Sequence, residues 1–205
     1  NYPLLFDTVS RVIHYYPCQK NLVMSILGIS ISRYHLVRCF SASLVLLFFK
    51  SDYDVTNTIT QSSVEVLDCL SKLILGLQNA DDIEMCKLIM STISEISKDV
   101  FKNDDFTQRL NERTTAANNI ANIAEQMLGD KSKKPEERCK YQMKIADQYK
   151  AFPSMRSNWL QTIVDINLQS NSNSSAFVTQ LHICALIATV IMYKTSFDSS
   201  IETRY

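Results

Sequence analysis

Apolar side chains recur every three or four residues along nearly the whole chain, and short polar stretches interrupt this pattern. The spacing puts the apolar residues on one face of an α-helix, so each periodic segment predicts an amphipathic helix. Pro135 and Pro153 suit the first turn of a helix, and Asn79 suits an N-cap. The expected helices cover residues 4–16, 20–30, 35–50, 57–77, 81–96, 104–127, 135–149, 153–166 and 176–194.

Two runs, Leu36 to Phe49 and Leu181 to Tyr193, are apolar nearly all round. A membrane span needs about 20 predominantly apolar residues, and both runs are shorter. We therefore expect two buried helices and no transmembrane segment. Ser51 to Thr56 is expected to be a polar break, Gly129 a left-handed helix cap, and Thr195 to Tyr205 a frayed end.

Consecutive helices with short connectors predict an all-α fold, either an α-solenoid of helical repeats or another bundle. Only three Gly and four Pro among 205 residues support this class, because both residues are common in the turns of β proteins. The sequence holds no strict repeat, so armadillo-like followed by tetratricopeptide-like hairpins are a hypothesis. Dense charge first follows the long apolar region at Phe101 to Asp105, which marks the best subdomain boundary.

Charge balance argues against a nucleic-acid partner. Lys and Arg total 21, as do Asp and Glu, so the net charge is zero, whereas phosphate contacts favour a basic excess. Lys131, Lys133 and Lys134 form one basic stretch, but Glu136 and Glu137 follow at once. This stretch is typical of a solvated loop.

The cysteines are scattered singly, so neither a disulfide framework nor a zinc site is indicated. Most lie among apolar residues, and we interpret them as small buried hydrophobes in a reducing compartment. The expected localisation is cytoplasmic. The six cysteines are Cys18, Cys39, Cys69, Cys86, Cys139 and Cys184.

No catalytic, cofactor-binding or metal-binding residue is predicted. The histidines His14, His35 and His182 are separate in sequence, and we interpret them as core or boundary residues. Three glycines cannot form a phosphate-binding loop. The acid pairs stand where helices begin and stabilise the positive helix end, at Asp81-Asp82, Asp104-Asp105 and Glu136-Glu137.

Two motifs near the end of the chain resemble a known family. Pro153, Arg156, Trp159 and Leu160 fit a Pro-x-x-Arg-x-x-Trp-Leu pattern, and the stretch from His182 to Ala188 fits His-x-x-Ala-Leu-Val-Ala. In this order and spacing they resemble lobe A of the DOCKER domain in DOCK-family exchange factors for Rho-type GTPases. By its spacing from Ile163, Trp159 is a core residue, with an interface anchor as the alternative.

Upstream segments resemble the same family. Arg38 with Ser41 to Leu44, then Val64 to Gly76, look like helices of the armadillo-like region before the DOCKER domain. Gln142 to Gln148 looks like the helix that leads into lobe A's Pro-Asp-Leu-Arg turn. The resemblance implies a helical-repeat region at 1–101 and an incomplete DOCKER domain at 102–205, and it is nearest to the zizimin-related subfamilies.

The sequence also departs from the family pattern. Ser175 to Thr179 stands where the family has Glu-Ala-Ala-x-Cys, and Ser154 and Met155 replace the Asp and Leu of the Pro-Asp-Leu-Arg turn. In the family, the GTPase-binding surface and the nucleotide-sensor loop belong to lobes B and C. Those lobes would follow Tyr205.

The resemblance therefore implies a scaffold fragment of an exchange factor rather than an enzyme. Lobe A would support the catalytic lobes and form a homodimer, and a Rac-type or Cdc-type GTPase would bind through the downstream lobes. The first residue, Asn1, is not Met, which agrees with a fragment. The alternative is a free-standing α-solenoid adaptor that binds other proteins with an exposed helix face.

Overall fold

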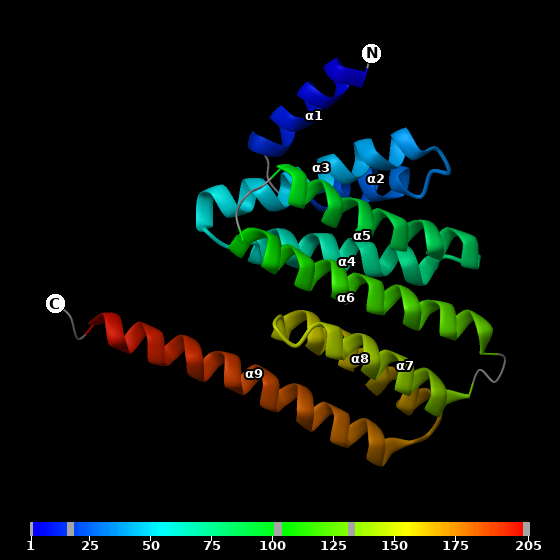
Figure 1. Cartoon of the computed structure of the whole chain (residues 1–205). Helices are drawn as coiled ribbons and strands as arrows, with labels where there is room; N and C mark the ends of the chain where they lie inside the picture. The colour runs from blue at the N-terminus through cyan, green and yellow to red at the C-terminus, as the bar shows by residue number, and fades with distance from the viewer. Residues whose placement is uncertain (1, 16–18, 101–103, 131–133, 203–205) are drawn as a thin grey trace. The chain divides into compact units, whose positions relative to one another are not determined.

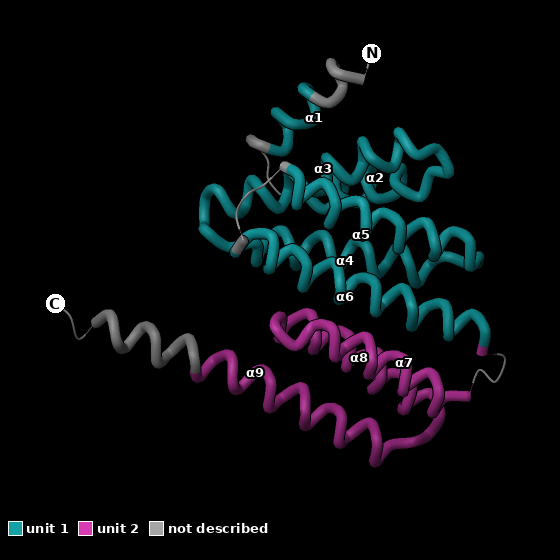
Figure 2. The backbone as a smooth tube through the Cα atoms, in the orientation of Figure 1, with its two compact units in different colours: residues 1–129 teal, residues 130–205 magenta. Residues whose placement is uncertain are grey.

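The computed structural model describes residues 2–15, 19–100, 104–130 and 134–202 (Figure 1). Its side chains are described for residues 7–13, 19–99, 105–130 and 134–192. The elements in these ranges are α-helices without a strand, so the all-α prediction is confirmed. The chain divides into two compact units, which we call unit 1 and unit 2, at residues 1–129 and 130–205 (Figure 2).

Unit 1 is a stack of helical hairpins in two layers. In one layer α3 packs on α1 and α5, and in the other α4 packs on α2 and α6. Each hairpin thus lies on the one before it, as in helical-repeat proteins, and the predicted α-solenoid is confirmed. The helices are α1 (Tyr2–Tyr15), α2 (Lys20–Ser30), α3 (His35–Thr56), α4 (Thr60–Gly76), α5 (Ala80–Val100) and α6 (Asp104–Gly129).

The first apolar run forms the centre of unit 1. Helix α3 contacts α1, α2, α4 and α5, so side chains on several of its faces leave water. Val45 and Phe48 are fully buried, and Phe49 is 3% exposed. Burial of this run is confirmed, apart from Leu36 at its start, which is exposed.

The expected polar break at Ser51 to Thr56 is wrong, because α3 continues through it. Asp52 is buried, and its Oδ2 accepts hydrogen bonds from the backbone N–H and the hydroxyl of Ser62, both at 2.9 Å. This carboxylate satisfies the open N-terminus of α4. The stretch from Ser51 to Thr56 is therefore the last part of the helix, which ends at Asn57 in the left-handed conformation with φ 53°.

The end of α6 and the division of the chain into units differ from what the sequence pattern suggested. Gly129 is the last residue of α6 and has no positive φ, so the predicted left-handed cap is wrong. Because α6 packs on α4 and α5, the units divide after Gly129 rather than near residue 101. The residues 101–103 lie outside the described part, and the assignment of 1–101 and 102–205 to different domain types stays a prediction.

Unit 2 contains three consecutive helices, of which α8 packs on both α7 and α9. Pro135 and Pro153 stand in the first turns of α7 and α8, as predicted. The helices are α7 (Pro135–Gln148), α8 (Pro153–Gln169) and α9 (Asn173–Glu202). Their buried core is formed by Ala146, Leu160, Ile163, Val164, Ala176 and Ile183.

Helix α9 corrects two expectations. It extends to Glu202, through residues that were expected to fray. Its apolar run is exposed rather than buried: between Asn173 and Met192 only 11% of the most apolar window is buried. By length and composition alone, this stretch could also cross a membrane, a test that the core helices of soluble proteins pass as well.

Candidate protein interaction surface

The start of α8 is held against the end of α7 by the residues of the Pro-x-x-Arg-x-x-Trp-Leu motif. Arg156 Nη2 donates a hydrogen bond to Asp147 Oδ1 at 3.3 Å. Trp159 stacks on the buried ring of Tyr149, with centroids 6.1 Å apart and planes at 20°. Trp159 also packs against the core of unit 2, which agrees with its interpretation as a core residue. The motif therefore builds a rigid support.

Only a narrow face of α9 meets this support. Ala176 and Ile183, two turns apart, are buried at 3% and 5% exposure, and Leu186 packs against the same core from the edge. Because α8 packs on α9 from one side, most of the other side chains between Asn173 and Met192 are exposed. The result is an apolar helix with most of its surface uncovered.

A continuous apolar stripe runs along the uncovered side. Its residues are exposed and follow one another by four and three positions, the spacing of a helix seam. No Asp, Glu, Lys or Arg occurs between Asn173 and Met192. The stripe, which we call the outer stripe, consists of Phe177, Leu181, Cys184, Ala188 and Ile191.

A groove of about 290 Å³ adjoins the C-terminal end of the outer stripe. The hydroxyl of Ser157 is bonded to the carbonyl of Pro153 at 2.8 Å, so the lining offers mainly apolar contact. The groove is lined by Pro153, Ser154 and Ser157 of α8 and by Ile187, Val190 and Ile191 of α9.

The described histidines are not core residues, but His35 is the first residue of α3, which agrees with the boundary role that the prediction also allowed. His182 and His35 are both exposed, and His14 lies outside the described side chains. His35 neighbours Cys39, whose Sγ is 3.6 Å from Nε2 and 3.7 Å from Nδ1. The sulfur is thus about equally far from the two ring nitrogens, and the i, i+4 spacing of the pair was readable in the sequence.

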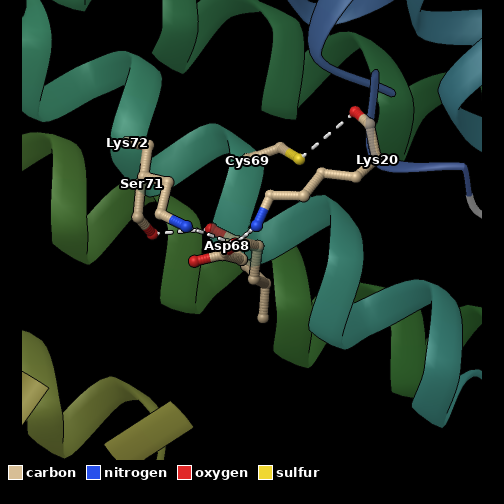
Figure 3. A network of polar contacts seen from close by, with 6 residues as sticks. Lys20, Asp68, Cys69, Ser71 and Lys72 are labelled. Atoms are coloured by element: carbon tan, nitrogen blue, oxygen red, sulfur yellow. Dashed lines mark hydrogen bonds and ion pairs between the residues drawn. The ribbon is translucent and has the colours of Figure 1, made fainter. Parts of the chain in front are cut away.

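A charged cluster that sequence reasoning missed joins α2 to α4 (Figure 3). Asp68 accepts hydrogen bonds from Lys20 at 2.8 Å and from Lys72 at 2.7 Å. Burial opposes ionisation, but the two lysines outweigh it and hold the pKa of the Asp68 carboxyl below its ordinary value. Lys20 and Asp68 are 48 residues apart, so no local pattern signals this structural clamp.

The cysteines fall into two groups. Cys69 and Cys86 are buried as predicted, and desolvation raises the pKa of their thiols to about 11 and about 12. Cys39 and Cys139 are half-buried, and Cys18 lies outside the described residues. Cys184 is exposed at the middle of the outer stripe, which corrects the prediction for this thiol.

The described residues contain no group of three or more His, Cys, Asp or Glu that could hold a metal ion. Asp81-Asp82 and Glu136-Glu137 lie in the first turns of α5 and α7, as helix-end stabilisation predicts. The candidate site is therefore a surface: the uncharged, apolar outer stripe of α9, which packs on α8, and the groove beside it.

Residues 140–203 match the family model described as DHR-2, Lobe A. These C-terminal helices are therefore similar to lobe A of the DHR-2 domain, which is the DOCKER domain. The lobe A match contains both motifs of the resemblance and spans about a third of the chain. No solved structure matches the chain significantly. Membership of unit 1 in the family's helical-repeat region and the zizimin-related subfamily stay predictions.

Proposed function

We propose that this chain is a non-catalytic scaffold segment of a DOCK-type guanine-nucleotide exchange factor that acts on Rho-family GTPases of Rac or Cdc type. The observation that carries the proposal is the lobe A match over residues 140–203. We further place the protein in the cytoplasm and in the zizimin-related subfamilies. Unit 1 would then be the end of the helical-repeat region.

The exposed face of α9 supports a docking role. Contiguous apolar surface of this kind on a folded protein marks a site where another surface binds. The family resemblance implies two such surfaces for lobe A, the catalytic lobes that it supports and a second lobe A. The contacts of Arg156 with Asp147 and of Trp159 with Tyr149 would hold α8 in place against α7. Helix α9, which packs on α8, would then keep its position when another surface binds to it.

In this proposal the chain positions the catalytic lobes and takes no part in nucleotide release itself. An exchange factor speeds nucleotide release by binding the nucleotide-free GTPase more tightly than the form that holds magnesium and nucleotide. The parts that make this distinction in the family are lobes B and C. Lobe A and the solenoid would hold those lobes in place.

Nucleotide release from a purified GTPase tests the proposal. A Rac-type or Cdc-type GTPase is loaded with a fluorescent nucleotide, and release is followed with and without the 205-residue chain. We expect the intrinsic rate in both cases, while EDTA, which removes magnesium, must accelerate release as the positive control. Acceleration by the chain itself would contradict a non-catalytic role.

The alternative of a free-standing adaptor gains support from unit 1, which lies outside the lobe A match. A cavity of about 400 Å³ there is lined by residues that include Arg33, Arg38 and Asp81. Tyr34 and Leu36, which stand between Arg33 and Arg38 in the sequence, are 76% and 77% exposed. Sequencing the transcript beyond the codon for Tyr205 separates the two functions. An exchange factor requires lobes B and C there, and an adaptor does not.

A further inference from the structure

One side chain ties the connection between α2 and α3, residues 31–34, to helix α5. Arg38 Nη1 donates hydrogen bonds to the backbone carbonyls of Ser32 at 3.0 Å and of Arg33 at 2.9 Å. The same nitrogen lies 3.9 Å from Sδ of Met85 in α5. The first two contacts hold the connection in place, and the third brings a cation against a thioether.

Met85 is open to small molecules from the solvent. It is half-buried and lines the cavity of about 400 Å³ in unit 1, together with residues that include Arg38 and Asp82. A water molecule takes up about 30 Å³ in the liquid, so the cavity admits a reagent as small as hydrogen peroxide. Met90, on the same helix, is only 4% exposed. The two methionines of α5 therefore differ in access to an oxidant.

We propose that Met85 is a redox-sensitive site, and that its reversible oxidation to the sulfoxide releases the α2–α3 connection from Arg38. The oxidant is hydrogen peroxide. A lone pair of Sδ attacks one peroxide oxygen, so that the S–O bond forms as the O–O bond breaks. The other oxygen leaves as hydroxide, takes the proton that remains on the attacked oxygen and becomes water. The sulfur loses two electrons, and the peroxide gains them.

Oxidation changes the competition for the guanidinium of Arg38. A thioether sulfur is a weak hydrogen-bond acceptor, whereas the sulfoxide is polar. Nη1 carries two hydrogens, and the carbonyls of Ser32 and Arg33 accept from this nitrogen already. The new oxygen on Met85 competes with these carbonyls for a charged donor, whose hydrogen bonds are about twice as strong as neutral ones. Arg38 then bonds the sulfoxide, and the two carbonyls lose their donor.

The released segment carries exposed side chains. Tyr34 in the connection and Leu36 at the start of α3 are 76% and 77% exposed. In the reduced chain they are held in one arrangement by Arg38 and by the hydrogen bond from the N–H of Tyr34 to the hydroxyl of Ser32 at 3.2 Å. Side chains that are already ordered bind a partner at a lower cost in entropy. Oxidation of Met85 therefore lowers the affinity of a partner that contacts this segment.

Hydrogen exchange of the whole chain, before and after treatment with hydrogen peroxide, tests the proposal. Mass spectrometry of peptides identifies the methionines that gain an oxygen and measures exchange over residues 31–37. We expect the sulfoxide at Met85, and exchange over 31–37 that is about fivefold faster, as the loss of an ordinary hydrogen bond predicts. Treatment with methionine sulfoxide reductases should restore the original exchange rate.

Two variants assign the effect to its residue. Met85→Leu keeps a side chain of similar volume that cannot be oxidised, so peroxide should leave its exchange over 31–37 unchanged. Met24→Leu is the matched control, because Met24 is also half-buried and belongs to α2, which leads into the connection. This control should respond to peroxide as the wild type does. Circular dichroism establishes that the helices of each variant are intact.

Three results would overturn the proposal. The first is a Met85 that stays reduced when Met192, which is 68% exposed, is fully oxidised. The second is exchange over 31–37 that is unchanged or slower once Met85 carries the oxygen. The third is a response to peroxide that persists in Met85→Leu.

Discussion

Helices α3 and α9 contain the two most apolar runs of the chain, and the fold treats them in opposite ways. In α3 the run lies among four other helices, and Phe48 is completely buried. In α9 the run packs on α8 from one side, and Leu181 remains 53% exposed. Hydropathy was therefore a reliable guide to helix formation and a poor guide to burial. Burial depended on the number of helices that pack against each run, and the local sequence does not indicate that number.

The difference also separates two uses of apolar surface. Burying it in α3 stabilises unit 1, because each side chain removed from water contributes to folding. Leaving it exposed in α9 gives unit 2 no such contribution and keeps the surface available for association. Substitutions in α3 should therefore act on stability, and substitutions in α9 on association.

The largest contrast is expected between Phe48→Ala and Phe177→Ala. Removing the buried ring should lower the free energy of unfolding by about 3–5 kcal/mol, because it leaves a cavity. Removing the exposed ring should change it by less than about 0.5 kcal/mol. Urea unfolding measures both. Trp159 is the only tryptophan and lies in unit 2, so its fluorescence should report little change in Phe48→Ala, while circular dichroism reports the loss. Equal losses for the two variants would remove the contrast.

Asp52 tests whether the polar end of α3 belongs to the core. Asp52→Ala should cost about 2 kcal/mol, because the N-terminus of α4 loses a buried acceptor. Asp54→Ala is the matched control on the same turn, since Asp54 is exposed and pairs with Lys50 along the helix surface. We expect that control to change unfolding by less than about 0.5 kcal/mol. An equal loss in the free energy of unfolding for both substitutions would show that the hydrogen bonds of Asp52 do not stabilise the fold.

The Asp68 clamp should make unit 1 sensitive to acid. The pKa of Asp68 is lowered in the folded chain, so its stabilisation is fully present above its ordinary value of 3.8 and is lost as the pH falls below it. Asp68→Asn should cost about 1 kcal/mol at pH 7, because Lys20 and Lys72 are half exposed and water screens the pair.

The control for this clamp lies in unit 2. Glu137→Gln removes a surface pair with Lys140 and should have no measurable effect. Urea unfolding at pH 7 and at pH 3 measures all three proteins. If wild type and Asp68→Asn lose stability equally between these pH values, the clamp does not contribute.

The smallest effects are expected at two turns, one in each unit. Asn57 and Asn171 adopt the left-handed conformation, with φ 53° and 58°. Glycine accepts this conformation without a steric cost, so Asn57→Gly and Asn171→Gly should change stability by about 0.5 kcal/mol or less. Alanine should cost about 1 kcal/mol at either position. Thermal unfolding monitors both pairs, and an alanine variant as stable as its glycine counterpart would contradict the strained geometry.

Much of the architecture was readable from local patterns. The second helix was predicted with its observed limits, and Pro135 and Pro153 marked the starts of α7 and α8. Asn79 accepts a hydrogen bond from the N–H of Asp81 at 3.0 Å, as its position before α5 predicted. These features depend on neighbours within one turn, and the sequence contains those neighbours.

The errors came from contacts between distant residues. The stretch after Lys50 was assigned to a break because its polar residues lack apolar spacing, yet Asp52 is held by Ser62 and Tyr53 donates to Asp105 at 3.2 Å. The clamp of Lys20 on Asp68 and the exposure of His182 were missed for the same reason. Both features depend on which helix packs against the residue concerned. The sequence of a single helix does not specify its neighbour.

By itself, the sequence determined that this protein is a series of helices and where most of them begin and end, because helical periodicity and caps act over a few residues. It also carried the motif residues of the lobe A match. Only the tertiary structure decided which apolar face is core and which is surface. The reason is that burial depends on how many helices surround a face, and α3 has neighbours on several sides where α9 rests on one.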